Sequence, residues 1–249
     1  MKLQYKPIDG TLALMDGDIL CYRIGFTTQD VSENIALSRI NTYIDNILFE
    51  SGASDYLIYL SPSKNYRHEV YPEYKGNRVA EKPKHFNLVR DYLINHEAAV
   101  VCDNEEADDG MGIKQMSMAE KVYEDGEWLT DYRSIICSID KDLKQIPGRH
   151  YDFVKNKFSF ITPEEGIYFF YQQLLTGDRV DNIPGLPKVG PVKAKKILGE
   201  MTDESTYKEK VLEAYRTILA LDETAARERI NTIGRLLWIR KEPNQMWSL

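Results

Sequence analysis

Four short apolar runs, separated by segments with helical spacing, constrain the fold of this chain more than any other feature. The runs cover residues 11–15, 56–60, 98–102 and 134–139. Each is bounded by polar or turn-forming residues, as buried parallel strands tend to be. Apolar side chains recur at helical intervals in the segments 31–50, 85–96 and 107–123. This alternation predicts an α/β protein whose mainly parallel sheet is covered by helices on both faces.

The remainder of the chain is predicted to form a hairpin followed by helices. Residues 150–160 favour a β-hairpin, and a Thr-Pro-Glu-Glu sequence marks a helix start near Pro163. The sequence after Gly177 is typical of helices, with turns at 182–190 and near Asp203. A length of 249 residues suits one large domain with an appended lobe. We therefore expect an α/β domain over residues 1–165 and a helical lobe over residues 166–249.

Composition indicates a cytoplasmic protein without a membrane segment. The chain has no run of about 18 apolar residues, the length that a membrane helix needs. Its first seven residues lack the apolar region of a secretory signal. The three cysteines, Cys21, Cys102 and Cys137, are isolated in the sequence and odd in number. We expect them to be reduced, buried thiols.

Acidic side chains follow the predicted strands where the strands end, and two more lie three residues apart around a later turn. The set comprises Asp16, Glu106, Asp108, Asp109, Asp140, Asp142, Asp178 and Asp181. Ligand sites in open α/β sheets lie beyond the carboxyl ends of the strands, so these groups are expected to converge on one edge. Taken singly, each group has another reading, as a turn, a helix N-cap or a charged first helical turn. A chance position of all of them at strand ends is the less favoured interpretation.

Such crowding of carboxylates is unfavourable without cations, because neighbouring like charges raise each other's pKa. Oxygen ligands without a set of His or Cys residues select Mg²⁺ or Mn²⁺ over zinc. Two such ions can activate a water and stabilise the leaving oxygen of a phosphodiester. The residues alone therefore predict phosphoryl chemistry.

Basic residues are segregated from these acids, although the formal net charge is −7. Seven Lys and Arg residues against three Glu lie between positions 64 and 90, and residues 186–197 hold four Lys and no acid. The stretch 66–78 mixes Arg, Lys and Tyr, which can clamp phosphates and stack on bases, although a solvated basic loop has the same composition. A global charge is a poor guide when charges are segregated, so nucleic acid remains a candidate partner.

Residues 182–194 carry a sharper signal. Gly185 and Gly190 permit close backbone approach, and helix-compatible residues follow, so the amides can face a phosphate at a helix N-terminus. A nucleoside-triphosphate loop would need Lys and then Ser or Thr after the second glycine. Pro191 and Val192 occupy those places, which excludes that reading.

In these residues the chain resembles the flap endonuclease and 5′→3′ exonuclease family, especially its bacteriophage members and the 5′-nuclease domain of bacterial DNA polymerase. The matching stretches run in family order at 15–18, 67–78, 106–109, 138–142 and 177–185. The resemblance covers nearly the whole chain. It implies a PIN-like sheet flanked by helices, a helical arch at about residues 67–97, and a helix–three-turn–helix motif at about residues 177–200.

The resemblance also implies residue roles and cofactors. It assigns two Mg²⁺ or Mn²⁺ ions, the first to Asp16, Glu106, Asp108 and Asp109 and the second to Asp140, Asp142, Asp178 and Asp181. It places in catalysis Asp16, Lys75, Arg78, Asp109 and Asp142. Its DNA contacts fall on Arg67, Tyr74, Lys75, Arg78, Gly185, Lys188, Gly190, Lys193 and Lys195. In some relatives the duplex-binding hairpin also holds K⁺.

One departure from the family pattern concerns the first metal site. Relatives often carry an Asp just after the second strand, whereas residues 60–66 here contain no acid. Asp18, Asp103 and Glu105 are the candidates to compensate. The second site looks complete.

The resemblance therefore predicts a metal-dependent 5′→3′ exonuclease with flap endonuclease and RNA-primer-removing activity, acting in DNA replication, repair or recombination. We expect a cytoplasmic monomer, in the host cytoplasm if phage-encoded. Its expected partners are DNA with a 5′ end or flap, an RNA–DNA hybrid, and replication proteins. Two alternatives are a PIN-type ribonuclease for single-stranded RNA and a non-catalytic DNA-binding replication accessory protein. The Gly185–Gly190 hairpin disfavours the first, and the carboxylate set disfavours the second.

Overall fold

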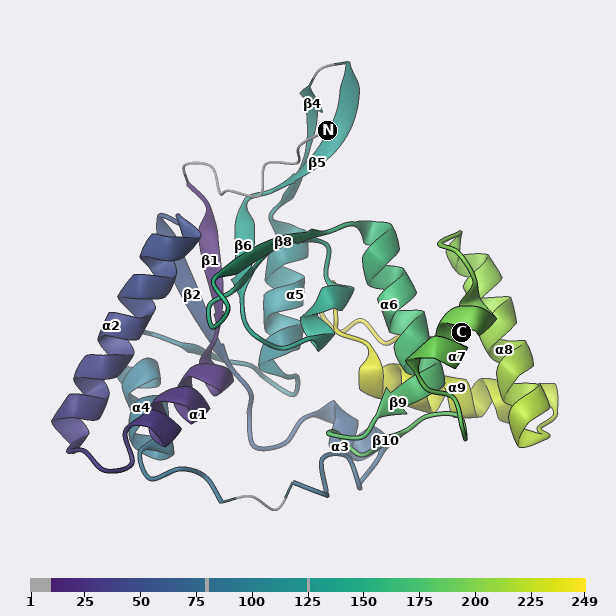
Figure 1. Cartoon of the computed structure of the whole chain (residues 1–249), viewed down its shortest axis with the longest axis horizontal. Helices are drawn as coiled ribbons and strands as arrows, with labels where there is room; N and C mark the ends of the chain where they lie inside the picture. The colour runs from purple at the N-terminus through teal and green to yellow at the C-terminus, as the bar shows by residue number, and fades with distance from the viewer. Residues whose placement is uncertain (1–9, 79–80, 125) are drawn as a thin grey trace.

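A computed structural model of the chain describes residues 10–78, 81–124 and 126–249. Its centre is a six-stranded sheet of order β3-β2-β1-β6-β7-β8, in which only β8 runs antiparallel to its neighbour (Figure 1). The strands are β1 (Leu12–Asp16), β2 (Asp55–Leu60), β3 (Val100–Val101), β6 (Ser134–Cys137), β7 (Gly148–Asp152) and β8 (Lys157–Ile161). The predicted parallel sheet and the predicted hairpin are confirmed. The first seven residues, on which the expectation about a secretory signal rests, lie outside the described residues.

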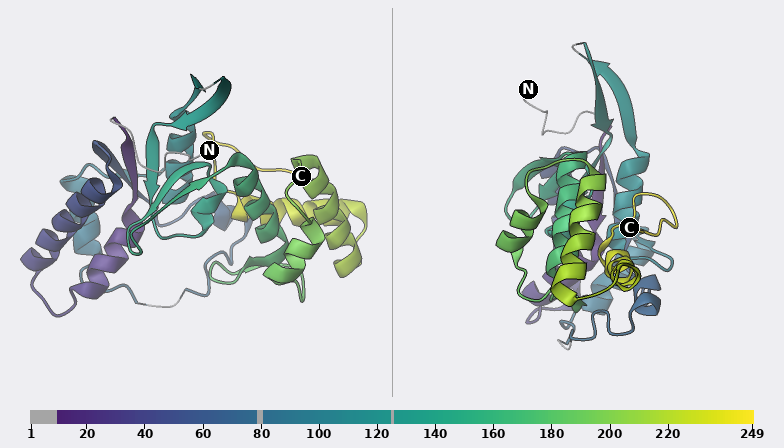
Figure 2. Two further views of the ribbon diagram at one scale, coloured as in Figure 1. Left: turned by 45° about the horizontal axis from the view of Figure 1, so that its top comes forward. Right: turned by 90° about the vertical axis from the view of Figure 1, so that its right-hand side faces the viewer.

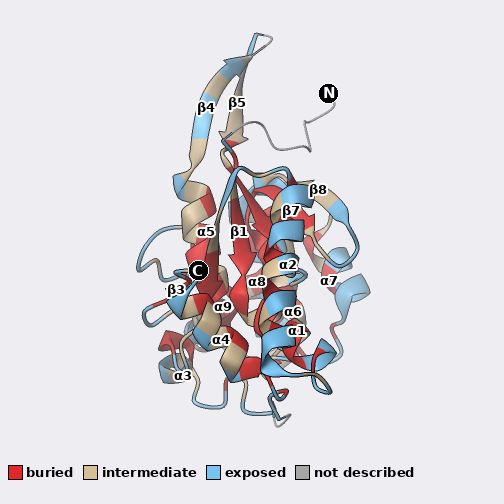
Figure 3. Cartoon of the chain, turned by 90° about the vertical axis from the view of Figure 1, so that its left-hand side faces the viewer, coloured by how far each residue is buried: buried red, intermediate tan, exposed pale blue. Residues whose placement is uncertain are grey.

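Helices cover both faces of this sheet, because strand residues point alternately to opposite sides. Ala13 and Met15 face a core formed with α1 (Gly17–Thr27), α2 (Glu33–Ser51) and α4 (Phe86–Asn95). Leu14 faces the other way, toward α5 (Ala107–Ser117). Figure 3 shows the buried strand β1 between these helices. The first helix, α1, was not among the predicted elements.

A second core lies among the helices of the C-terminal lobe. These are α6 (Pro163–Thr176), α7 (Pro191–Leu198), α8 (Glu204–Leu219) and α9 (Glu223–Leu237). Thr162 caps α6, and the helix begins at Pro163, as the sequence predicted. The expected domain boundary at residue 165 therefore falls inside the first turn of this helix. Residues 238–249 return across the lobe, where Trp247 packs against Phe170 at a ring distance of 5.1 Å.

The helix expected over 107–123 is a correction. It ends at Ser117, and the chain continues into a separate hairpin of β4 (Ala119–Glu124) and β5 (Glu127–Tyr132), which projects from the body in Figures 1 and 2. An Asp-Gly pair at positions 125–126 is a hairpin signal, and Gly126 has a φ of +89°. The pairing of β4 with β5 therefore replaces the end of the helix that the apolar spacing predicted.

The expected arch segment contains two helices, α3 (Tyr66–Val70) and α4, joined by a long connection that runs below the sheet in Figure 1. Residues 79–80 of this connection lie outside the described residues.

Two expectations from composition concern burial and hydropathy. Within the described ranges, no helix combines the length and the apolar content that a bilayer crossing requires. All three cysteines are buried and unpaired with one another, as expected.

Candidate metal and phosphate site

The carboxyl ends of β1 and β6 bring the first acidic groups together. These strands are parallel neighbours, so the residues that follow them emerge at the same edge of the sheet. Asp16 ends β1 and caps α1 by accepting a hydrogen bond from the Ile19 amide at 3.0 Å. Its other oxygen accepts from the Ser138 hydroxyl at 2.8 Å, at the end of β6. Asp140 follows two residues later and accepts from the Asp142 amide at 2.8 Å.

The N-terminus of α5 supplies the next group. Glu106 is the N-cap residue and forms a capping box with Asp109, while Asp108 lies in the first turn. An acidic residue is favourable there because the helix dipole is positive at this end. The charges of Asp140 and Asp16 help to raise the pKa of Asp108, so the first turn of α5 lies near the ends of β1 and β6.

The third group comes from the C-terminal lobe. Asp178 lies in β9 (Gly177–Asp178), and Asp181 lies in the turn before β10 (Ile183–Pro184). One Asp178 oxygen accepts from the Val180 amide at 2.7 Å, which fixes the turn. The other oxygen accepts from the Lys141 ammonium at 2.8 Å, so the lobe is joined to the end of β6. Carboxylates from three distant stretches of the chain therefore lie near the same edge of the sheet.

Four of these carboxyl groups have raised pKa values. Burial, followed by repulsion from Asp18, raises the pKa of Asp16 to about 7. Burial, followed by repulsion from Asp140, raises the pKa of Asp142 to about 7. Burial also raises the pKa of Asp108 and that of Asp140, with Asp140 and Asp181 as the respective acidic neighbours. Burial is the main cause in all four cases and neighbouring carboxyl groups add to it, so a bound cation would favour the ionised form of these groups.

Two other carboxylates are compensated by cations. Burial raises the pKa of Glu106, but Arg67 and Lys75 outweigh it and bring this pKa down to about 2. Burial likewise opposes the lowering of the Asp178 pKa, which the hydrogen bond from Lys141 brings about. The site thus contains carboxylates whose charge is balanced by nearby cations and others whose charge is not.

The donor set fits a hard divalent cation. The candidate ligands at this edge are all carboxylates, and Mg²⁺ and Mn²⁺ prefer oxygen ligands. Among the described residues, no three of these side chains are already arranged as a cage around one ion. Arg78 and Lys75 contact Asp181, and Lys75 also contacts Glu106 at 2.6 Å. The fit therefore rests on the chemistry of the carboxylates and on the raised pKa values that a bound cation would offset.

Arg67 and Asp109 lie apart from the open part of the site. Asp109 has no exposed surface, and Arg67 is 2% exposed. The guanidinium donates to both Asp109 oxygens, at 2.5 and 2.9 Å, and also to the carbonyls of Leu236 and Trp238. The Asp109 carboxylate further accepts from the amides of Glu106 and Arg240. This geometry is that of a buried structural ion pair, which differs from the metal-binding role expected for Asp109 and the phosphate-binding role expected for Arg67.

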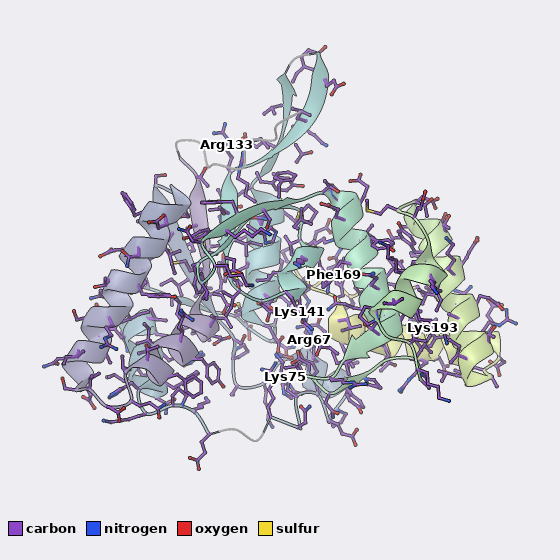
Figure 4. The ribbon with its side chains drawn as sticks, viewed as in Figure 1. Arg67, Lys75, Arg133, Lys141, Phe169 and Lys193 are labelled. Atoms are coloured by element: carbon purple, nitrogen blue, oxygen red, sulfur yellow. The ribbon has the colours of Figure 1, made fainter. Side chains whose placement is uncertain are left out.

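The remaining residues of the basic stretch lie at the site with different exposures. Tyr74 is buried, and its hydroxyl, which has one hydrogen to donate, lies 3.1 Å from a carboxylate oxygen of both Glu106 and Asp181. The expected stacking of Tyr74 on a base therefore has no exposed ring face in this arrangement. The side chain of Arg78 is 49% exposed and that of Lys75 is 23% exposed. Figure 4 shows Lys141, Arg67 and Lys75 close to one another between the sheet and the C-terminal helices.

The predicted duplex-binding segment forms the turn between α6 and α7. Gly185 packs so closely on Thr176 that an added Cβ would lie 2.1 Å from the backbone, so this glycine is needed for packing. Gly190 is the N-cap residue of α7 and is exposed. Lys193 lines a shallow pocket with Gly190 and Val192. Lys188, Lys193 and Lys195 are all exposed, and Figure 4 shows Lys193 on α7.

The segment that lacks the family's acid has a structural use here. The Ser61 hydroxyl accepts from the Ala107 amide at 2.9 Å and so caps α5. Asp18 accepts from the Ser61 amide and from Arg90, and Glu105 pairs with Arg240 at 2.9 Å. Two of the three candidates for compensation are therefore already engaged.

Three residues near the site were not predicted from the sequence. Lys141 joins Asp178, Asn65 donates to Glu106 at 3.0 Å, and Gln173 donates to Asp142 at 2.7 Å. Lys141 could have been inferred from its position between two predicted ligands. The other two had no local signal, because only the fold brings them to the carboxylates.

Carboxylates gathered at the carboxyl edge of a mainly parallel sheet, with exposed lysines near Gly190, fit an α/β protein that acts on phosphate esters. The family described as "5′-3′ exonuclease, N-terminal resolvase-like domain" matches residues 11–170, more than half of the chain. The chain belongs to this 5′-3′ exonuclease family, as its motifs predicted.

Individual relatives agree with this assignment. The chain is 33% identical over 205 residues to a 5′-3′ exonuclease of Buchnera aphidicola, covering 74% of this chain and 67% of the relative. It is 29% identical over 210 residues to DNA polymerase I of Bacillus caldotenax, covering 75% of this chain and only 23% of the polymerase.

Solved structures show the same fold at low sequence identity. The flap endonuclease of bacteriophage T5, in a complex with DNA and metal ions, matches with a TM-score of 0.59 and 18% identity, covering 91% of this chain and 95% of that chain. The T5 5′-exonuclease with bound zinc matches with a TM-score of 0.62 and 17% identity, covering 91% of this chain and 89% of that chain.

Proposed function

We propose that this protein is a divalent-metal-dependent 5′→3′ exonuclease and flap endonuclease that hydrolyses phosphodiesters of DNA. The observation that carries the proposal is the convergence of carboxylates from β1, α5, β6 and the β9–β10 turn, four of which have raised pKa values. Family membership supports the reaction class. The bound DNA of the T5 flap endonuclease supports the substrate class.

Two groups of carboxylates are proposed to hold two Mg²⁺ or Mn²⁺ ions. The first consists of Asp16, Glu106 and Asp108, and the second of Asp140, Asp142, Asp178 and Asp181. When bound, such ions activate a water and stabilise the leaving oxygen of the phosphodiester. Asp109 is left out of the first group because its carboxylate is occupied by Arg67 and has no exposed surface.

The cations of the site are proposed to hold the scissile phosphate. Lys75 and Arg78 reach the carboxylates from the same stretch of chain and keep part of their surface exposed. Their charge can neutralise phosphate oxygens next to the acidic edge. The exposed lysines around Gly190 are proposed to bind the duplex backbone, with K⁺ as an additional ligand of this turn. The expected products are a 5′-phosphate and a 3′-hydroxyl.

We place the activity in DNA replication, repair or recombination, with flaps and RNA–DNA hybrids as further substrates. The decisive experiment is digestion of 5′-labelled blunt, nicked, gapped and flapped duplexes with and without Mg²⁺, together with a hybrid duplex and a single-stranded RNA. We expect Mg²⁺-dependent cleavage from the 5′ end of duplexes and little cleavage of the single strand. Preferential cleavage of single-stranded RNA, or duplex binding without any cleavage, would contradict the proposal.

Substitution of the second group tests the residue assignment. We expect Asp142→Asn and Asp178→Asn to abolish cleavage, while binding of duplex DNA in Ca²⁺ persists, because the proposed duplex contacts lie on the exposed lysines around Gly190 rather than on these aspartates. Lys121→Ala, on the projecting hairpin, serves as a control and should cleave at the wild-type rate. Unchanged cleavage by either aspartate variant would contradict the second site.

A further inference from the structure

A chain of two buried amides links the Asp142 carboxylate to the backbone that follows α9. The Ile239 amide donates to the Gln145 side-chain oxygen at 3.2 Å. The Gln145 side-chain nitrogen donates to the Leu237 carbonyl at 2.7 Å and to the Gln173 oxygen at 2.8 Å. The Gln173 nitrogen then donates to Asp142 Oδ1 at 2.7 Å. Gln145 is completely buried, and Gln173 is 6% exposed.

The direction of these consecutive hydrogen bonds is set by the backbone groups of Ile239 and Leu237. A backbone N–H can only donate, and a backbone carbonyl can only accept, so Ile239 and Leu237 determine which end of the Gln145 amide carries the oxygen. Gln145 in turn presents a nitrogen to Gln173, whose oxygen must face it. The nitrogen of Gln173 must therefore face Asp142, and reversal of either amide would bury unsatisfied donors and acceptors.

The arrangement selects one orientation of the Asp142 carboxylate. Oδ1 is held by Gln173, while Oδ2 accepts no hydrogen bond from the described part of the protein and stays available to a cation. Gln173 also lies on α6, four residues before Gly177, and Gln145 lies in the short 3₁₀ helix η1 (Asp142–Gln145). The amide pair therefore joins the two segments that carry Asp142 and Asp178.

We propose that Gln173 is a positioning residue that orients Asp142 for the second divalent ion, with its own orientation set through Gln145 by the backbone at 237–239. The proposal rests on the proposed two-ion function. Groups that hold a metal ligand in place commonly change metal affinity by about 10–100-fold when they are removed. Gln173 acts on the site through Asp142 and contacts no substrate in this proposal.

The test is Mn²⁺ binding to the whole protein without DNA, measured by isothermal titration calorimetry, alongside cleavage of a 5′-labelled duplex. Gln173→Met keeps the length of the side chain and removes both hydrogen bonds. We expect it to weaken binding of one Mn²⁺ by about tenfold or more and to raise the half-saturating Mn²⁺ concentration for cleavage equally. The matched control is Gln172→Met, because Gln172 is a half-buried glutamine of the same helix. It should bind Mn²⁺ like the wild type.

A double-mutant cycle separates positioning from general loosening of the fold. If Gln173 acts through Asp142, then Gln173→Met should weaken Mn²⁺ binding no further in a protein that already carries Asp142→Asn. An additive loss in the double variant would overturn the proposal. Gln173→Asn keeps the amide but shortens the side chain, so it should also weaken binding of the same Mn²⁺ ion. This variant replaces Gln173→Met in the test if the methionine variant is too unstable to measure.

Two outcomes distinguish a failure of the positioning role from a failure of the proposed nuclease function. Wild-type Mn²⁺ affinity in well-folded Gln173→Met overturns the positioning role and leaves the nuclease function intact. A wild-type protein that neither binds Mn²⁺ nor cleaves DNA overturns the proposed function itself.

Discussion

Asp142 and Asp178 face the same site with opposite electrostatic surroundings. The Lys141 ammonium lies 2.8 Å from an Asp178 oxygen and balances its charge. Burial and the charge of Asp140 raise the pKa of Asp142 to about 7. An aspartate has a pKa of 3.8 in the unfolded chain. Between these two values the folded protein retains a proton that the unfolded chain releases, so the free energy of unfolding falls as the pH rises through this window. Above pH 7 the full penalty is present.

Asp142→Asn is therefore expected to stabilise the metal-free protein at pH 7.5, because asparagine is neutral at every pH. In EDTA its melting temperature should exceed that of the wild type by several degrees at pH 7.5. At pH 4 the two should melt nearly together, since Asp142 is then largely protonated in the folded wild type. Mg²⁺ at pH 7.5 should raise the melting temperature of the wild type more than that of the variant. A lower melting temperature for the variant at pH 7.5 would argue against this electrostatic account.

Arg67 provides a second prediction at the residue scale. Its guanidinium is buried and hydrogen-bonded to Asp109, so Arg67→Met leaves an unpaired buried carboxylate. We expect the free energy of unfolding to fall by about 3–5 kcal/mol. The side chain of Arg78 is 49% exposed, so Arg78→Met should cost less than about 1 kcal/mol. Urea unfolding measures both, and equal stabilities would favour the phosphate-binding role that the motif first indicated for Arg67.

At the scale of elements, the β4–β5 hairpin lies far from the acidic edge. It precedes β6 directly, and the amino end of this parallel strand is opposite its carboxyl end, where the carboxylates gather. Arg149 holds the base of the hairpin through Asp131 at 2.8 Å and through the Tyr132 carbonyl. The outer part of the ribbon projects beyond the body (Figure 2).

Replacement of residues 122–129 by a two-residue Asn-Gly turn should therefore leave catalysis intact. We expect a cleavage rate within about twofold of the wild type and a small loss of stability, because Asp131 and Tyr132 remain to pair with Arg149. Steady-state cleavage of a 5′-labelled duplex and thermal melting measure the two quantities. A tenfold loss of activity in a well-folded variant would show that the hairpin takes part in the reaction.

The elements that the sequence predicted well are those with a strong local pattern. The apolar run before Asp16 and the Thr-Pro-Glu-Glu start of α6 specify their structures through nearby residues. Residues 107–123 were misjudged because helical spacing continued past the true end of α5 at Ser117. The pairing of β4 with β5 decides that case, and pairing energy comes from residues that are separate along the chain.

At the scale of the whole molecule, charge is separated between two regions despite a net charge of −7. Carboxylates gather at the sheet edge, while α7 presents exposed lysines at Lys193, Lys195 and Lys196. Arg133 lies at the base of the β4–β5 hairpin, well away from Lys193 (Figure 4). Duplex affinity should therefore depend on one basic surface rather than on total charge.

Lys193→Ala combined with Lys196→Ala should weaken duplex binding in Ca²⁺ and flatten its salt dependence. Each lost phosphate contact lowers the slope of log affinity against log salt by about 0.9, so the pair should lower it by about 1.8. Fluorescence anisotropy over a series of KCl concentrations measures this slope. The control pair, Lys121→Ala in β4 with Arg133→Ala at the base of the hairpin, removes the same charge and should leave the slope unchanged. Equal effects of the two pairs would contradict a localised duplex site.

The sequence by itself determined the α/β class, the family and the acidic groups that end the strands, because apolar periodicity and short motifs act through residues close together in the chain. Only the tertiary structure decided which acids face the open site. Asp108 and Asp109 are neighbours in sequence, yet the buried Asp109 carboxylate is hydrogen-bonded to Arg67 and to the backbone amide of Arg240. The amide chain to Asp142 likewise depends on Gln145, Gln173 and the backbone after α9 meeting in space. Burial and hydrogen bonding between distant segments set these roles, and no local pattern encodes them.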